Sequence, residues 1–233
     1  WDLAFSEKDN VKLEKVFITS KLSIDLKLKL ESFIRENKYP IAVRSSSLLE
    51  DSQYQPLAGT YETYMLPNNS KSVKKRLTSL TVAIKKIFAS MFNYEARSLL
   101  ENTAHRIQEE KMAVLIQEII GIHHKSDRFY PSFSGVLQSI NYYPVSYMKR
   151  KEGVAYLALG LGRTIAEGEK SLRFSPKYPG IIPQYFSVRS TIDNSQNQFY
   201  ALDLNKGMKL LKNSLEENTS LFDLNIAEKD GEL

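Results

Sequence analysis

The side chains best suited to phosphate chemistry in this sequence gather in residues 41–63. Arg44 follows a short apolar run, residues 41–43, that is typical of a buried strand, and three serines come directly after it. An arginine guanidinium donates paired, planar hydrogen bonds to phosphate oxygens, and small residues let backbone N–H groups approach a phosphate closely. The segment therefore predicts a strand that ends in a phosphate-gripping arginine.

The chain returns to this segment through an acidic pair, Glu50 and Asp51, and then through Ala58-Gly59 to Glu62-Thr63. The β-branched and aromatic residues at 60–64 predict a second strand. A glycine at its start commonly satisfies a turn. Glu62 could orient Arg44, orient a metal-bound water, or serve as a cross-strand partner on the surface, and the residues leave that choice open.

The segments V-R-S-S, E-D, A-G and E-T, in one register from Val43 to Thr63, resemble the nucleotide-binding domain of phosphoenolpyruvate synthase and pyruvate phosphate dikinase. The resemblance implies an α+β, ATP-grasp-like fold, in which two lobes clamp a nucleotide. It implies that Arg44 contacts the nucleotide phosphates and that Gly59, Glu62 and Thr63 lie near them. The family usually has glutamine where this chain has Thr60.

Three later segments extend the resemblance. Gln117, Glu118 and Ile119 resemble the hinge that recognises adenine through backbone groups and an amide side chain, although without the first motif they would simply end a core strand. Ser134-Gly135-Val136 resembles the family's S-G-V strand, which follows the hinge at a similar distance. Gly160-Leu161-Gly162 resembles its G-L-G-E loop.

That loop carries one departure, because Arg163 stands where the family has glutamate. Arg163 could add a phosphate contact, and Glu167 could replace the lost carboxylate. The family's glycine-lysine segment and its acidic magnesium-binding segment are not found, so the ligands of Mg²⁺ are expected outside these residues. The resemblance covers about residues 20–175.

Composition narrows the other possibilities. The sequence of 233 residues has no cysteine, which excludes disulfides and thiolate catalysis and suits the cytoplasm. Its apolar runs are shorter than the roughly 20 residues of a membrane span. The basic residues at 71, 74–76, 85 and 86 predict the solvated face of a helix rather than a nucleic-acid site. His123 and His124 predict a solvated loop, and no histidine is assigned to metal binding or phosphorylation.

Hydrophobic periodicity predicts helices at 7–17, 23–36, 71–92, 93–106 and 206–214. Strands are expected at 112–116, as a fully buried run, and at 131–141, 153–159, 171–174 and 198–202. We expect two lobes, a helical one at 1–110 with the phosphate-gripping strands and a strand-rich one at 111–233 with the hinge and an unassigned C-terminal segment.

The resemblance implies the ATP-binding portion of a dikinase, which passes a phosphoryl group from ATP to a histidine carrier domain and then to pyruvate. The carrier and pyruvate-binding domains would belong to the same polypeptide, of which this chain, beginning at Trp1, is expected to be an inactive piece. The alternative is a non-catalytic, nucleotide-binding regulatory module on a degenerate domain, and the Arg163 departure favours that alternative.

Overall fold

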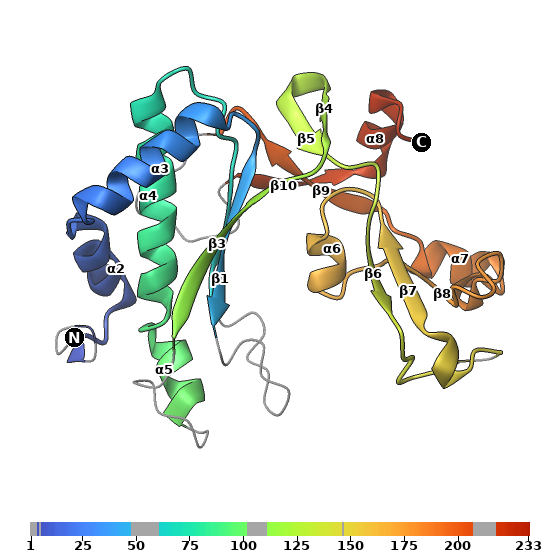
Figure 1. Ribbon diagram of the computed structural model, residues 1–233. Coiled ribbons are helices and arrows are strands. Elements are labelled where there is room, and N and C mark those ends of the chain that lie inside the picture. Colours follow the sequence, from blue (N-terminus) through green and yellow to red (C-terminus); the bar gives the residue numbers. More distant parts are fainter. Residues whose placement is uncertain (1–3, 5, 48–60, 102–110, 146, 207–217) are drawn as a thin grey trace. The chain divides into compact units, whose positions relative to one another are not determined.

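The computed structural model describes residues 4, 6–47, 61–101, 111–145, 147–206 and 218–233 (Figure 1). It contains two compact units, one of residues 1–119 and 204–218, the other of residues 120–203 and 219–233. The expected division after residue 110 differs from this arrangement. Residues 112–118 pair along their whole length with residues 41–47, and they therefore belong to the first unit.

Among its described residues, the first unit is a three-stranded antiparallel sheet with helices on one face (Figure 1). Helix α4 packs against all three strands, and α2 and α3 pack against α4. The elements in chain order are α2 (Asn10–Thr19), α3 (Ile24–Glu36), β1 (Ile41–Ser47), β2 (Thr63–Leu66), α4 (Val73–Ser90), α5 (Tyr94–Glu101) and β3 (Met112–Glu118).

The two longest helices of this unit begin at serine caps. The Ser23 hydroxyl accepts a hydrogen bond from the Leu26 N–H, and the Ser72 hydroxyl accepts one from the Lys75 N–H. The apolar stripe of α4 forms the core, where Leu80 is fully buried against the sheet. The predicted helices at 23–36 and 71–92 are confirmed, with ends shifted by at most two residues.

The sheet has the strand order β2-β1-β3. Side chains alternate between its faces, so that Ile41, Val43 and Tyr64 are buried beneath the helices. The strand does not end at Arg44, as predicted, but continues through the serines to Ser47. Ser45 and Ser47 consequently lie on the helix-covered side, where both are buried.

The prediction that residues 112–116 form a fully buried strand is wrong. β3 lies at one edge of the sheet, and only one of its faces packs on the core, through Met112, Val114 and Ile116. Leu115 on the other face is 41% exposed. A continuous apolar run therefore marks a strand here, but it does not say whether both faces are covered.

The prediction that the basic run of α4 is a solvated face is also wrong for three of its members. Arg76, Lys85 and Lys86 are buried, whereas Lys74 and Lys75 are exposed. The Lys85 ammonium donates hydrogen bonds to the carbonyl oxygens of Ile18 and Ser20, at the end of α2, and burial lowers the pKa of Lys85. Long basic side chains thus tie α4 to its neighbours.

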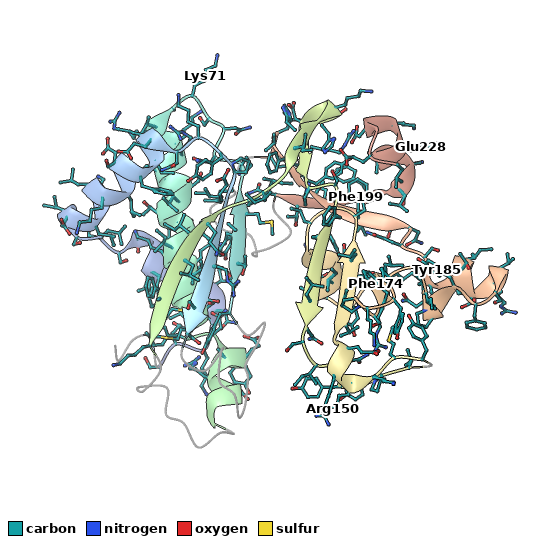
Figure 2. The ribbon with its side chains drawn as sticks, turned by 45° about the vertical axis from the view of Figure 1, so that its right-hand side comes forward. Lys71, Arg150, Phe174, Tyr185, Phe199 and Glu228 are labelled. Atoms are coloured by element: carbon teal, nitrogen blue, oxygen red, sulfur yellow. The ribbon has the colours of Figure 1, made fainter. Side chains whose placement is uncertain are left out.

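The second unit contains two antiparallel sheets among its described residues, with the strand orders β10-β9-β5-β4 and β6-β7-β8. Phe199, labelled in Figure 2, is fully buried at the centre of the first of them. The strands are β4 (Ile122–His124), β5 (Arg128–Tyr130), β6 (Ser134–Gln138), β7 (Val154–Ala158), β8 (Leu172–Phe174), β9 (Gln198–Asp203) and β10 (Thr219–Asp223). The helices are η2 (Lys125–Asp127), η3 (Arg150–Glu152), α6 (Arg163–Ala166), η4 (Pro183–Tyr185), α7 (Val188–Asn194) and α8 (Leu224–Asp230).

The four strands predicted in this unit are confirmed, although most are shorter than expected. β4, β5 and β10 were missed because segments of three to five residues give too little periodicity to recognise. The helix predicted at 206–214 falls almost wholly outside the described residues. Helices combined with small antiparallel sheets are compatible with the predicted α+β class.

Candidate functional site

The face of the first unit's sheet that α4 does not cover carries three of the predicted site residues. Arg44 on β1 pairs with Thr63 on β2, and Ala42, two residues earlier, pairs with Gln117 on β3. Directly paired residues, and residues two apart in a strand, project from the same face. We call this the open face, and it is made by residues 42, 44, 46, 63, 65, 113, 115 and 117.

Arg44 and Thr63 form the closer kind of antiparallel pair. The Ile119 N–H donates a 2.9 Å hydrogen bond to the Pro40 carbonyl oxygen, in the same register as the rest of the β1–β3 ladder. Even-numbered residues of β1 therefore direct their backbone groups toward β3. On its other side Arg44 makes a non-hydrogen-bonded pair with Thr63, in which the two Cα atoms are about 4.5 Å apart.

The guanidinium of Arg44 is exposed, and among the described residues it has no hydrogen-bond or ion-pair partner. The side chains around it on the open face are small or neutral, and none is a carboxylate. A permanently charged, fork-shaped donor on such a surface is arranged to receive an anion. The open face can therefore hold a phosphate group.

Glu62 is directed to the other side of the sheet. Its carboxylate accepts a hydrogen bond from the Tyr64 hydroxyl, and its N–H donates to the Ser90 hydroxyl of α4 at 3.4 Å. Tyr64 is buried, and the Lys86 ammonium lies 5.3 Å from the centre of its ring. Glu62 thus anchors the start of β2 to the helical layer, a role that none of the three sequence-based alternatives anticipated.

Lys86 extends this network to α2. It is 1% exposed, and its ammonium lies 2.6 Å from the Glu14 carboxylate. The sequence held no signal for this role, because Lys86 lies far from the apolar stripe of Leu80 and Ile84 on a helical wheel of α4. Gly59, like the acidic pair at 50 and 51, lies outside the described residues, and its place over the nucleotide stays a prediction.

The three residues of the predicted adenine hinge lie in three different environments. The Gln117 side chain is exposed on the open face. Gln117 lies one strand across and two residues along from Arg44, so the two Cα atoms are about 8 Å apart. Backbone groups alternate along a strand, so the N–H and C=O of Glu118 point to the outer edge of β3, away from β1. Ile119 is 8% exposed, and its N–H is already bonded to Pro40.

Ser134 belongs to the second unit, where it begins β6 and pairs with Ala158. Its hydroxyl oxygen is buried without a hydrogen-bond partner among the described residues. Gly162 lies beside it, since a Cβ added at that glycine would be 3.8 Å from the Ser134 hydroxyl. A buried hydroxyl without a partner is uncommon in folded proteins.

Arg163 is held by neighbours from three elements. Its Nε donates to Glu167 at 2.6 Å, its Nη1 donates to the Thr219 hydroxyl at 3.0 Å, and its guanidinium lies 4.5 Å from the centre of the Tyr200 ring. The Tyr200 hydroxyl also donates to Glu167, and burial together with this bond raises the pKa of Tyr200. Arg163 and Glu167 therefore bind each other and stabilise the second unit.

The prediction of a solvated loop at the histidine pair is confirmed only in part, because the His123 side chain is 59% exposed whereas that of His124 is 4% exposed. Both histidines lie on β4, and the ring of His124 stacks on that of Tyr130, with 3.9 Å between centroids. Nearby, Asp230 accepts hydrogen bonds from Arg128 at 2.6 and 3.1 Å and from the Tyr130 hydroxyl at 2.8 Å. Burial alone would raise the pKa of Asp230, but these bonds outweigh burial and lower it.

A family model described as pyruvate phosphate dikinase, AMP/ATP-binding domain, matches residues 2–228. The chain belongs to this family. The resemblance expected over about residues 20–175 is thereby confirmed, and it extends to nearly the whole sequence. The AMP/ATP-binding domain therefore includes both units, and the tail that the motifs left unassigned is part of it.

A relative of known sequence supports the same conclusion. The chain is 31% identical over 159 residues to the uncharacterized phosphotransferase YvkC of Bacillus subtilis (strain 168). The match covers 67% of this chain and 17% of that relative. The matched part of this chain thus spans less than a fifth of the relative's length.

Two limits on the site follow from the described residues. They contain no group of three or more His, Cys, Asp or Glu side chains arranged to hold a metal ion. In the same part of the chain, no helix is both long enough and apolar enough to span a membrane.

Proposed function

We propose that this AMP/ATP-binding domain binds ATP with the phosphates on the open face, where Arg44 holds them. The observation that carries the proposal is the exposed guanidinium of Arg44, which has no carboxylate partner among the described residues. An unpaired arginine beside small side chains leaves both its charge and its hydrogen bonds to a ligand. Its charge would also stabilise the negative charge of the transferred phosphoryl group.

The other predicted residues take separate roles in this proposal. The Thr63 hydroxyl, directly across from Arg44, donates to a phosphate oxygen. The Gln117 amide and the outward backbone groups of Glu118 bind the adenine edge, which offers a donor and an acceptor side by side. Ile119 supports the strand end. Within the second unit of the proposed ATP-grasp-like fold, the Ser134 hydroxyl beside Gly162 is a separate candidate for ligand contact.

The reaction that we propose is phosphoryl transfer from ATP to a histidine carrier domain and on to pyruvate, in the cytoplasm and within one longer polypeptide. The family membership and the phosphotransferase relative support it. The residues of this chain bind and orient the nucleotide, while ligands for Mg²⁺ come from outside the described residues. We therefore propose that residues 1–233 bind ATP without turning it over.

The alternative is a nucleotide-binding regulatory module without catalysis. One observation favours it, namely that Arg163 replaces the family's glutamate and contacts Glu167, Thr219 and Tyr200. Such an arginine stabilises the fold and leaves no carboxylate at that position of the loop.

Labelled ATP distinguishes the two. We expect a base-stable, acid-labile phosphoryl label on the longer polypeptide that contains this domain, and no turnover by residues 1–233 alone. Turnover by the isolated chain would overturn its proposed inactivity. ATP binding by the longer polypeptide without any label would favour the regulatory module.

A further inference from the structure

A groove at the N-terminal end of α4 has the composition of an anion-binding site. Its volume is about 690 Å³, and all of its described lining residues belong to the first unit. That volume falls within the range of small-molecule sites. Among the residues that the structure describes, its charged lining is entirely basic, namely Lys74, Lys75, Arg76 and Lys206. No residue of the open face lines it, so the groove is distinct from the proposed ATP site.

The N-terminal end of α4, which lies in this groove, has positive charge without a neighbouring acidic side chain in the described part of the chain. The first turn of an 18-residue helix has partial positive charge, which favours acidic side chains, yet this turn contains Lys74 and Lys75 and no acid. Ser72 caps only the Lys75 N–H, and the N–H groups of Val73 and Lys74 have no acceptor among the described residues. A bound anion would satisfy these donors and remove the repulsion.

Arg76 provides a second and independent observation. It is 5% exposed, and its Nη1 donates to two neutral oxygens, the Asn37 carbonyl at 2.9 Å and the Asn68 side chain at 3.4 Å. Its Nε has no partner, and no carboxylate pairs with it among the described residues. Burying a charge without a counterion is costly, so this guanidinium indicates a missing anion.

Asn68 holds the arginine in place beneath the groove. Its Nδ2 donates to the carbonyl oxygens of Asn37 and Tyr39, both at 3.0 Å, while its Oδ1 accepts from Arg76. The residue adopts a left-handed backbone conformation with φ of 51°, which asparagine tolerates better than most residues. The floor of the groove is therefore formed before any ligand binds.

We propose that this groove binds a small phosphorylated ligand with at least two negative charges. A compact ligand is favoured over nucleic acid because Lys85 and Lys86, further along α4, are buried and do not extend the basic surface. Lys71 lies at the turn before α4, and its side chain points away from that helix in Figure 2. Lys71 does not line the groove. Leu66 and Pro67 supply an apolar wall for the organic part of such a ligand.

Calorimetric titration with inorganic pyrophosphate at low ionic strength tests the proposal. We expect saturable binding that weakens at least about tenfold in Lys74→Gln/Lys75→Gln, because charge-assisted hydrogen bonds to phosphate are lost. Both lysines are exposed, so this variant should fold as the wild type does. The matched control, Lys21→Gln/Lys27→Gln, removes the same charge from exposed positions outside the groove.

The control should retain the affinity of the wild type for pyrophosphate, and Arg44→Gln, which removes the open-face arginine, should keep a saturable pyrophosphate site that Lys74→Gln/Lys75→Gln weakens. Three results would overturn the proposal. They are absence of saturable binding, equal weakening in both double lysine variants, and binding that is lost in Arg44→Gln but kept in Lys74→Gln/Lys75→Gln. The last result would place the pyrophosphate on the open face.

Discussion

Arg44 and Thr63 face each other across β1 and β2 on the sheet face that α4 leaves uncovered. The pair is of the non-hydrogen-bonded kind, in which the side chains come closest. A fixed positive charge and a hydroxyl donor are thus presented together by two strands. Strands hold side chains more rigidly than loops do, and such placement suits the binding of a phosphate group.

The Thr63 hydroxyl is expected to strengthen ATP binding. Thr63→Val keeps the shape of the side chain but removes its hydrogen bond, which should lower the affinity for ATP about fivefold. Calorimetric titration with ATP measures the change. Thr63→Ser, which keeps a hydroxyl, should bind nearly as tightly as the wild type. Equal affinities for all three proteins would remove Thr63 from the site.

Lys86 is expected to stabilise the first unit through its buried contacts with Glu14 and Tyr64. Lys86→Met leaves the Glu14 carboxylate without its partner, and we expect a loss of about 3 kcal/mol in the free energy of unfolding. Urea denaturation measures it. Lys12→Met, at an exposed pair with Asp9, should change stability by less than about 1 kcal/mol. Similar effects in the two variants would contradict the role of the buried network.

Asp230 is expected to make the second unit sensitive to acid. Its folded-state pKa is lowered, so its contribution to stability is present above the unfolded-state value of about 3.9 and is lost as pH falls through the folded-state value. Asp230→Asn should therefore be about 3 kcal/mol less stable than the wild type at pH 7. The difference should shrink below about pH 4.

Urea denaturation at several pH values tests this expectation. Asp193→Asn, which removes an exposed i,i+4 pair with Arg189, should have little effect at any pH. A difference between the wild type and Asp230→Asn that did not vary with pH would show that the bonds from Arg128 and Tyr130 do not set the acid response.

Gly160 is required by the backbone of the G-L-G loop. Its φ is 83°, and a Cβ there would lie 2.7 Å from the Tyr200 carbonyl oxygen, which also accepts the Leu161 N–H. Gly160→Ala should lower the free energy of unfolding by about 2 kcal/mol or more. Gly180→Ala is the matched control, because an added Cβ there meets nothing within 4 Å. Thermal denaturation of both variants measures the effect. Equal melting temperatures would contradict the requirement for glycine at position 160.

The parts of the fold that depend on local sequence could be predicted. The helices at 23–36 and 71–92 follow from their apolar periodicity, and Ser23 caps the first of them, as its position before the helix predicts. The same local reasoning found β1 and identified Arg44 as a candidate residue for phosphate binding.

The contacts that define each residue's role could not be predicted, because they depend on distant parts of the chain. Arg163 is bound by Thr219, 56 residues away, and Glu62 is tied to Tyr64 on a face that only the pairing of strands establishes. The exposure of one face of β3 likewise follows from its position at the sheet edge. Periodicity within a single segment contains none of this information.

The most direct test of the central claim is the affinity of this domain for ATP with and without the Arg44 guanidinium. Calorimetric titration should show that Arg44→Gln binds ATP about 10- to 100-fold more weakly than the wild type, since a charged hydrogen bond to phosphate is lost. Arg189→Gln, which removes an arginine whose side chain is 93% exposed, should leave the affinity unchanged. Equal affinities of the wild type and Arg44→Gln would contradict the assignment of the phosphates to the open face.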